Sequence, residues 1–374
     1  MKTRTVILTG KRTPIGCFMG SLQRIPAPLL LSHCISKLPR ALLEKAQVSV
    51  FGCSAGGLGM SPGKQALLAG GVSASLPVFS VDLGHSSGLK ALAICTQHIN
   101  LGSEAGVCGG MQNSSMAPYL LKGRKGVMGN QKLEDSLVSD TCSYEGKHEG
   151  FLVEKANAEL NISRGEQDEY AYDSYKFRDV AVNMDFFKDE IAGIKELEND
   201  EEVGKVTQSS INPAPLYYKG GTVTTINSGL PGDGACVLAV CSLSFAQKIG
   251  VEPLAEVVGF SEVGCSHFEF PKASSKATLK LMKEVGWSMS EVDLFDINDY
   301  FSTNSLAFSK ELGIPLSKIN VNSGTVALGD PIHTTGARQA LTLARSLKQR
   351  GLLKGVAVSP HILGAIAVAI SSYN

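Results

Sequence analysis

Short apolar runs alternate with stretches of helical periodicity along the whole chain. Strand-like runs occupy residues 5–10, 48–56, 76–82 and 105–110, with helical patterns between them. A chain that alternates in this way places helices over the faces of a sheet, so its strands are buried on both sides. The pattern therefore predicts an α/β fold with largely parallel, buried sheets.

Two segments of the chain are near repeats of one another. Residues 85–92, HSSGLKAL, resemble residues 333–340, HTTGARQA, and each begins a helix-like stretch after a glycine-bearing strand or loop. The surrounding elements run strand, helix, strand in the same order in both places. This repetition predicts two similar α/β halves.

The region between the two halves has a different pattern. Residues 119–210 are polar and rich in loop signals, but residues 165–191 are helical in period, with Ser163 as N-cap and Glu166 as its capping-box partner. Residues 221–240 return to a buried strand. We expect an N-terminal half of residues 1–118 plus about 211–249, a loop domain of residues 119–210, and a C-terminal half of residues 250–374.

The composition narrows the classes of partner and cofactor. The 374 residues include 35 basic and 35 acidic side chains, so the formal net charge is zero. Nucleic-acid binding needs a basic surplus, so no nucleic-acid partner is expected, and self-association becomes more plausible. The nine cysteines form no C-x-x-C pair and no zinc-spaced cluster with histidine. We therefore expect reduced thiols and no metal site.

The most apolar stretch, residues 355–371, makes a poor membrane-spanning helix because Pro360 and His361 lie near its middle. No transmembrane segment is expected. The first dozen residues are basic without acids, and the last residues, SSYN, are not the peroxisomal tripeptide. These features favour a mitochondrial location and leave the cytosol and peroxisome open.

Six ordered segments resemble the thiolase family, which includes acetyl-CoA acetyltransferases and 3-ketoacyl-CoA thiolases. They are residues 11–22, 109–121, 162–174, 221–235, 298–301 and 320–331. The resemblance implies two similar α/β halves that form a five-layered αβαβα core with an inserted loop domain. It also implies a homodimer, or a heterodimer with a thiolase paralogue.

The resemblance does not extend to the family's reactive side chains. The family carries a nucleophilic cysteine at the start of a helix, and His85 stands at that position. Asp330 stands where the family's glycine-histidine-proline segment has its histidine. Pro360 falls on the second cysteine, although a slip of one residue would place Ser359 or His361 there. The resemblance thus implies a degenerate member that lacks the catalytic cysteines.

Two interpretations of His85 follow from its position. The histidine either fills the space that a cysteine vacates or acts as a catalytic base, and a protonated His85 is predicted to pair with Asp330. Asn298 matches the asparagine that holds a water in the family's oxyanion hole. Asparagine also stabilises turns through its side chain, so that interpretation stays open as well.

Coenzyme A binding in the family rests on the loop domain and on an N-x-S-G-type turn. The corresponding residues here are His148, which precedes a glutamate instead of methionine, and Ser228 and Gly229, where glycine takes a usual serine position. These departures make binding of coenzyme A thioesters doubtful, and no other cofactor is expected.

From these losses we expect a catalytically inactive, dimeric structural or interaction subunit of a larger mitochondrial assembly. The alternative is an acyl-CoA-binding enzyme with non-thiolase chemistry, such as decarboxylation of a thioester. The least favoured alternative is an active acetyl-CoA acyltransferase.

Overall fold

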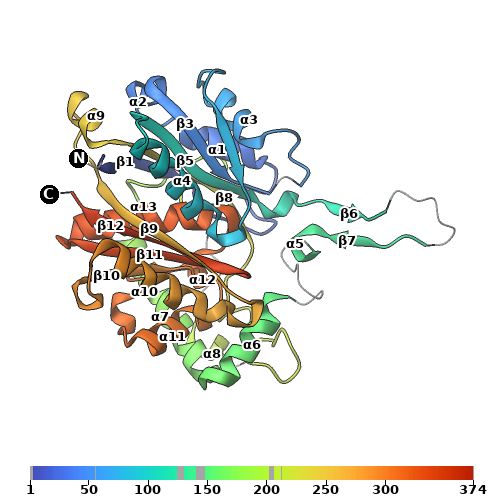
Figure 1. Cartoon of the computed structure of the whole chain (residues 1–374). Coiled ribbons are helices and arrows are strands. Elements are labelled where there is room, and N and C mark those ends of the chain that lie inside the picture. Colours follow the sequence, from blue (N-terminus) through green and yellow to red (C-terminus); the bar gives the residue numbers. More distant parts are fainter. Residues whose placement is uncertain are drawn as a thin grey trace.

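The computed structural model describes residues 3–54, 56–123, 130–139, 148–201, 206–211 and 213–373. One 10-stranded sheet runs through it in the order β10-β11-β12-β9-β1-β8-β5-β3-β4, with β2 paired to β8 (Figure 1). Its strands are β1 (Thr5–Arg12), β2 (Gly16–Cys17), β3 (Ala46–Gly52), β4 (Val78–Val81), β5 (Ala105–Asn113), β8 (Gly232–Ser242), β9 (Ala255–Gly264), β10 (Leu294–Ile297), β11 (Lys354–His361) and β12 (Gly364–Ser372). The expected strands at 5–10, 48–56, 76–82 and 105–110 correspond to β1, β3, β4 and β5.

Helices lie between and outside the two halves of this sheet. The helices are α1 (Ala27–Ile35), α2 (Arg40–Lys45), α3 (Pro62–Ala69), α4 (Ser87–Asn100), α5 (Ser136–Ser139), α6 (Glu149–Leu160), α7 (Arg164–Asn183), α8 (Gln208–Ile211), α9 (Leu243–Lys248), α10 (Ala273–Val285), α11 (Ser302–Leu312), α12 (Thr325–Leu328) and α13 (Thr335–Arg350). Helices α4 and α13 pack against each other in the middle of the molecule. The two repeated sequence segments therefore begin the two central helices.

Three apolar clusters show the layering. The central cluster joins Leu92 of α4 and Leu341 of α13 to Leu238 of β8 and Val368 of β12, so both sheet halves bury a face on the central helices. A second cluster packs α1 and α3 on the outer face of the β3–β5–β8 half. A third packs α10 and α11 on the outer face of the β10–β11–β12 half. The five-layered αβαβα core that the sequence implied is present.

The expectation of largely parallel sheets is wrong. Within the described residues only β3–β4, β3–β5 and β10–β11 pair in parallel. One antiparallel pair is the β11–β12 hairpin, in which His361 pairs with Gly364. Strand β9 lies antiparallel to both β1 and β12, which are far from it in the sequence. Strand β8 lies antiparallel between β1 and β5. It returns to the first half from the loop region, and the domain boundaries expected there stay predictions.

The loop region contributes a hairpin and two longer helices. Strands β6 (Tyr119–Leu121) and β7 (Leu133–Asp135) form an arm that projects from the body (Figure 1). The predicted capping box of α7 is confirmed, because the Ser163 side chain accepts from the Glu166 amide and the Glu166 carboxylate accepts from Ser163. The helix ends at Asn183, earlier than its predicted end at 191, and the chain then turns through Asp185 at a positive φ.

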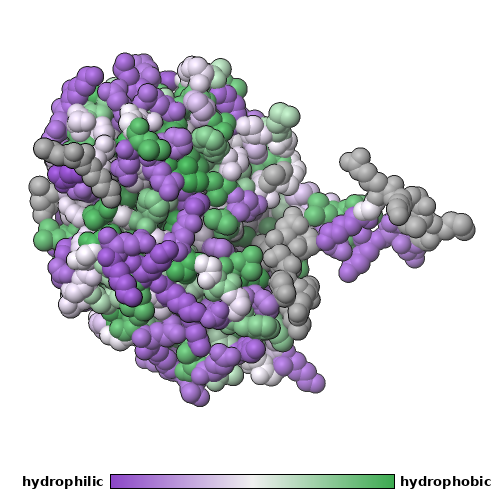
Figure 2. All heavy atoms as spheres, in the orientation of Figure 1, coloured by the Kyte–Doolittle hydropathy of each residue, from purple (hydrophilic) through white to green (hydrophobic). Residues whose placement is uncertain are grey.

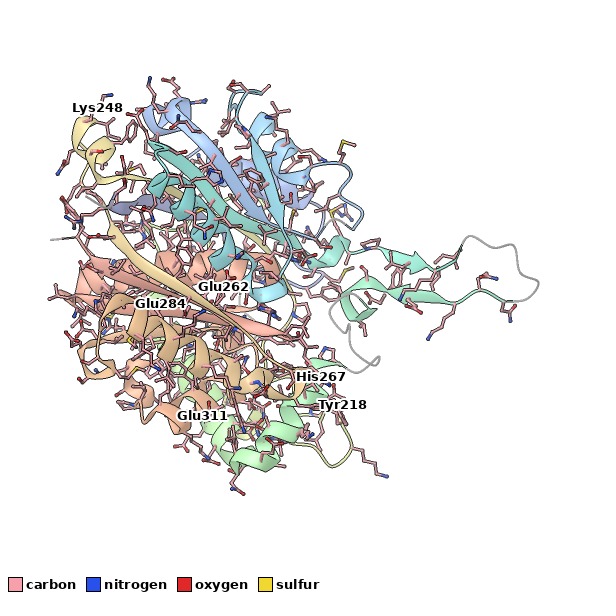
Figure 3. All side chains as sticks on the ribbon, in the orientation of Figure 1. Tyr218, Lys248, Glu262, His267, Glu284 and Glu311 are labelled. Carbon is pink, nitrogen blue, oxygen red and sulfur yellow. The ribbon has the colours of Figure 1, made fainter. Side chains whose placement is uncertain are left out.

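Opposite charges are interspersed where α10 and β9 meet solvent. Lys90 pairs with Glu262, and Lys280 pairs with Glu284. Figure 3 labels both glutamates, and Figure 2 shows hydrophilic residues over much of this side.

The apolar stretch at 355–371 forms the buried β11–β12 hairpin. None of the described helices is long and apolar enough to cross a membrane.

Candidate active site

His85 and Asp330 form a buried pair where the two halves meet. His85 lies in a single 3₁₀ turn, Gly84–Ser86, that leads into α4, and Asp330 follows α12. The imidazole Nε2 lies 2.7 Å from Asp330 Oδ2, and the Thr335 hydroxyl donates to Asp330 Oδ1 over 2.7 Å. The predicted pairing of these two residues is therefore present.

Burial and charge act in opposite directions on His85. Burial by itself lowers the pKa of the imidazole, but the Asp330 carboxylate outweighs it and, with a smaller effect of Glu149, raises the pKa of His85 to about 9. His85 is therefore an imidazolium at neutral pH. Its second ring nitrogen, Nδ1, has no hydrogen-bond partner among the described residues.

Tyr300 and Glu149 complete the surroundings of this imidazolium. The Tyr300 ring lies 4.8 Å from the His85 ring, centroid to centroid, at a tilt of 35°. Glu149, the first residue of α6, is buried, and its burial raises the pKa of the carboxyl. A cation that faces an aromatic ring and two carboxyl groups is electrostatically stabilised.

The Asn298 side chain stabilises its own loop in this structure. Its Oδ1 accepts the Tyr300 amide over 3.0 Å, and its Nδ2 lies 3.4 Å from the Ser359 hydroxyl. This geometry fits the turn-stabilising interpretation, because the acceptor oxygen is already engaged. A role in holding water stays a prediction.

The three residues proposed for the second cysteine position differ in where they point. Pro360 is buried near the end of β11, beyond Val358, the last β11 residue that β10 pairs with, so its missing N–H fits this edge. The Ser359 hydroxyl faces Asn298, and its carbonyl accepts the Ser86 hydroxyl. Of the three, only His361 lines the cavity beside His85, and burial lowers its pKa.

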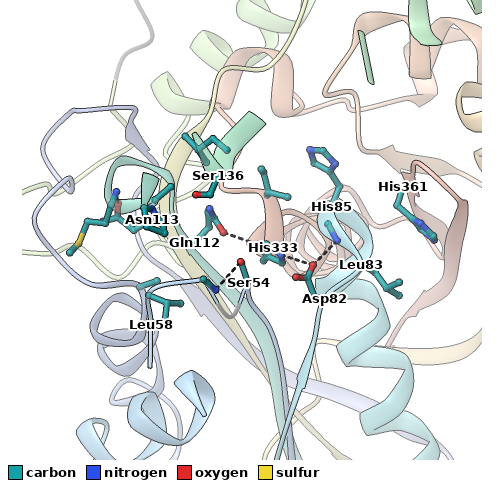
Figure 4. Close-up of a pocket in the computed structure, with 18 of the residues that line it drawn as sticks. Ser54, Leu58, Asp82, Leu83, His85, Gln112, Asn113, Ser136, His333 and His361 are labelled. Carbon is teal, nitrogen blue, oxygen red and sulfur yellow. Dashed lines mark hydrogen bonds and ion pairs between the residues drawn. The ribbon is translucent and has the colours of Figure 1, made fainter. Parts of the chain in front are cut away.

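A cavity of about 250 Å³ opens beside His85. Its wall comes from both halves and from the loop region (Figure 4). The lining residues that carry polar side chains are Ser54, Asp82, His85, Gln112, Asn113, Ser136, Glu149, His333 and His361. Leu363 lines the cavity without closing it, and Tyr300 is not part of the wall.

The residues proposed to bind coenzyme A support neighbouring segments instead of lining this cavity. His148 caps α6, since its Nδ1 accepts the Gly150 amide. The Ser228 hydroxyl donates to the Thr224 carbonyl over 2.6 Å, and the Gly229 amide donates to the Tyr300 carbonyl over 2.7 Å. Coenzyme A binding by these residues stays a prediction.

Sequence reasoning missed a second histidine–aspartate pair in the same wall. His333 Nε2 lies 3.0 Å from Asp82 Oδ1, and His333 Nδ1 lies 2.7 Å from Gln112 Oε1. Figure 4 shows this chain of contacts. The available signal was the repeat itself, because His333 is the counterpart of His85.

No cysteine lines the described part of this cavity. None of the eight cysteines among the described residues forms a disulfide, and Cys142 lies outside those residues. Burial raises the pKa of Cys34 to about 12 and that of Cys17 to about 11, so neither is a thiolate at neutral pH. Across the described ranges no group of three or more His, Cys, Asp or Glu side chains is arranged to hold a metal.

Comparison with known proteins identifies the family. A model described as "Thiolase, N-terminal domain" matches residues 5–244, and one described as "Thiolase, C-terminal domain" matches residues 251–371. The chain belongs to the thiolase family.

Individual members of the thiolase family match over nearly the whole chain. The "Probable acetyl-CoA acetyltransferase" of Dictyostelium discoideum is 36% identical, with 94% of this chain and 90% of the relative covered. The mitochondrial acetyl-CoA acetyltransferase of Bos taurus is 33% identical, with 92% and 86% covered. The crystal structure of human mitochondrial 3-ketoacyl-CoA thiolase in complex with CoA is 27% identical, has a TM-score of 0.95, and covers 100% of this chain and 98% of that one.

These comparisons contradict the expectation of an inactive structural subunit. The relatives that match this thiolase-family chain over most of its length are named as acetyl-CoA acetyltransferases and thiolases. The expectation took the joint absence of the family's nucleophile and proton-handling residues to mean absence of the reaction. His85 and Asp330 bind one another beside an open cavity.

Proposed function

We propose that this protein is a coenzyme A-dependent acyltransferase that cleaves or forms 3-oxoacyl thioesters, with His85 and Asp330 at its reaction centre in place of the family's cysteine. The observation that carries the proposal is the buried His85 imidazolium, whose Nδ1 has no partner in the described structure while the residue lines the cavity. Family membership and the names of the relatives support acyl transfer as the reaction class.

An imidazolium cannot act as a nucleophile, because both of its nitrogens carry protons. It is suited to donate a hydrogen bond to an oxygen on which negative charge develops. In the proposed reaction the sulfur of coenzyme A bonds to the 3-carbonyl carbon of the substrate, and His85 stabilises the resulting oxyanion. Collapse of this intermediate breaks the bond between C2 and C3 and yields two acyl-CoA products without an acyl-enzyme.

Steady-state thiolysis of acetoacetyl-CoA by coenzyme A tests this function. Direct transfer requires both substrates on the protein together, so initial rates should follow a sequential pattern, whereas an acyl-enzyme gives a ping-pong pattern. His98→Gln is a matched control for His85→Gln, because His98 lies in the last turn of α4, the helix that follows His85, and outside the cavity wall. Absence of thiolysis by the wild-type protein would contradict the proposal.

Coenzyme A thioester binding is part of the same proposal. Its support is the bound CoA named for the human 3-ketoacyl-CoA thiolase structure, which superposes over the whole of this chain. Calorimetric titration with acetyl-CoA measures it directly. Ser228→Ala and His148→Gln test the residues named from the sequence, and unchanged affinity in both would exclude them as binding groups.

Assembly and compartment complete the proposal. A homodimer is supported by β4, an edge strand of the sheet on which Phe79 is 46% exposed, and light scattering of wild type and Phe79→Glu tests it. A paralogue partner would appear as a second chain on co-purification. A mitochondrial location is supported by the name of the bovine relative, and imaging of the tagged full chain tests it.

A further inference from the structure

The same seven-residue pattern leads into each of the two central helices. Residues 82–88 read Asp-Leu-Gly-His-Ser-Ser-Gly, and residues 330–336 read Asp-Pro-Ile-His-Thr-Thr-Gly. Each half of the chain therefore carries an aspartate three residues before a histidine, and a glycine three residues after it.

The two segments exchange partners across the interface between the halves. His85 of the first segment binds Asp330 of the second over 2.7 Å, and His333 of the second binds Asp82 of the first over 3.0 Å. The result is two crossed histidine–carboxylate pairs.

The glycines explain how the segments approach closely enough to cross. A Cβ atom on Gly88 would lie 2.3 Å from the Ala337 nitrogen, and one on Gly336 would lie 2.5 Å from the Leu89 nitrogen. No other residue type fits at this distance without moving a helix. The close approach brings each histidine within reach of the other half's aspartate.

The two pairs differ in which atom is left for a substrate. Both ring nitrogens of His333 are engaged, by Gln112 Oε1 at 2.7 Å and by Asp82 Oδ1 at 3.0 Å, so neither is left for a substrate. The Asp82 side chain is 61% exposed. It lines the cavity, and its Oδ1 also accepts the Gly84 amide, at 3.4 Å. Its Oδ2 has no partner within the described residues.

We propose that Asp82 is the proton-exchanging residue of this cavity, and that His333 is the residue that positions it. The inference rests on the proposed function. It adds a proton acceptor to the reaction, which His85, as a hydrogen-bond donor, does not supply. The cavity wall then offers both a hydrogen-bond donor, His85 Nδ1, and a fixed carboxylate oxygen, Asp82 Oδ2.

The Asp82 carboxylate accounts for every proton that the reaction moves. Asp82 takes the proton from the thiol of coenzyme A as its sulfur bonds to C3 of the 3-oxoacyl thioester. When the bond between C2 and C3 breaks, its electron pair goes to C2, and the Asp82 carboxylic acid returns the proton there. The products are one shortened acyl-CoA and one acetyl-CoA, with no oxidant, reductant or enzyme adduct.

The charges around the two groups keep them in the required states. Asp82 faces His333, whose hydrogen bond lowers the pKa of the carboxyl, and Cys53 lies on the same side. His85 faces Asp330, Glu149, Tyr300, His148 and His361, and its pKa is raised to about 9. Two groups whose pKa values are moved apart are present as base and acid at the same neutral pH.

Glu149 and His361 are the competing candidates, because both line the cavity. Asp82 is preferred because two hydrogen bonds to a single oxygen fix its orientation and leave the other oxygen free. A base that is held in place is effective only when its acceptor atom faces the substrate.

Exchange of the methyl protons of acetyl-CoA with solvent deuterium, followed by NMR, isolates the step at C2. It needs neither a second substrate nor thiolysis. We expect wild-type protein to catalyse exchange, and Asp82→Asn to lose about 100-fold or more. Asp189→Asn is the matched control, since Asp189 has a side chain that is 76% exposed and lies outside the cavity wall; its rate should stay within about twofold of wild type.

His333 is tested by rescue. His333→Gln keeps a side-chain donor for Asp82 and should retain most of the exchange rate, whereas His333→Ala should lose it. Calorimetric affinity for acetyl-CoA should be the same in both variants, which separates positioning of the carboxylate from damage to the site. Equal rates in the two variants would overturn the role of His333.

Three outcomes would overturn the assignment of Asp82. They are wild-type exchange rates in Asp82→Asn, loss of exchange in Glu149→Gln or His361→Gln with Asp82→Asn unaffected, and no exchange by the wild-type protein. Exchange that depends on Asp82 without any thiolysis would instead contradict the proposed function alone. Thiolysis that does not depend on Asp82 would leave the proposed function standing and remove this inference.

Discussion

The two halves of the molecule carry the same sequence pattern at the start of their central helices, yet they present different atoms to the cavity. In the His85–Asp330 pair the carboxylate is fully buried and the histidine keeps a free nitrogen. In the His333–Asp82 pair the histidine is held at both nitrogens and the carboxylate is exposed. Both histidines are buried, so the comparison shows that the repeated motif presents a donor in one half and an acceptor in the other according to whether the aspartate is buried or exposed.

Removing the His85 donor should have the largest effect on activity of the changes considered. In His85→Gln the imidazolium is lost, while Asp82 and His333 are untouched. Loss of one preorganised oxyanion donor costs about 100- to 1000-fold in kcat. Thiolysis of acetoacetyl-CoA measures this loss, with His98→Gln as control. A variant that keeps wild-type kcat would show that His85 only fills space.

Asp330→Asn should lower the pH at which His85 loses its proton. Without the carboxylate, burial lowers the pKa of His85 from about 9, so the imidazolium is lost at lower pH. The alkaline limb of the kcat profile should therefore move to lower pH, with a loss of about tenfold at about pH 8. The profile of Asp82→Asn should keep its alkaline limb, because that limb belongs to the other pair.

The titration of His85 should also make the stability of the folded protein depend on pH. A group whose pKa is higher in the folded state contributes stability below its unfolded pKa and loses it as pH rises through the folded value. For His85 the contribution is complete below pH 6.5 and is lost as pH rises through about 9. Melting temperatures of the wild type should fall across this window, and those of Asp330→Asn should fall less. Identical slopes would contradict the pairing.

Gly88→Ala tests the contact that lets the pairs cross. The added Cβ would meet the backbone of α13 at 2.3 Å, so the helices must separate, at a cost of about 1–3 kcal/mol in the free energy of unfolding. The control is Gly165→Ala in α7, where the nearest atom, Ser163 Oγ, lies 3.9 Å away. Chemical denaturation of both variants checks the difference. A stable Gly88→Ala variant would mean that the close approach is not required.

The smallest expected effect concerns the cysteines. Because the described cavity wall contains no thiol, alkylation with iodoacetamide under native conditions should leave thiolysis unchanged. Rapid inactivation that acetyl-CoA prevents would place a cysteine in the site and contradict the exchange of roles between His85 and the family's nucleophile.

Much of the fold follows from the order of apolar and polar positions. The runs at 5–10 and 105–110 became β1 and β5, and the Ser163–Glu166 signal located α7, because burial and helix capping are local properties. Strand direction did not follow, because most antiparallel neighbours, such as β1–β8 and β5–β8, are strands that are not consecutive in the chain.

The site was predicted only in part. The pairing of His85 with Asp330 could be foreseen from the family's spacing, but His333 and Asp82 could not be assigned, because each aspartate binds the histidine of the other half and not the one three residues away. Ser228 and His148 make local contacts, with the Thr224 carbonyl four residues earlier and with the Gly150 amide two residues later, and both are absent from the cavity wall. The inactive role was wrong because the absence of the family's reactive side chains was taken to mean absence of the reaction, whereas the relatives that match this chain are named as acetyl-CoA acetyltransferases and thiolases.

The most direct test of the central claim is the initial-rate pattern of acetoacetyl-CoA thiolysis, with both substrates varied, for wild type and His85→Gln. The account predicts wild-type turnover with intersecting double-reciprocal lines, and loss of that turnover in the variant. Parallel lines that persist in His85→Gln, or no turnover by the wild-type protein, would contradict it.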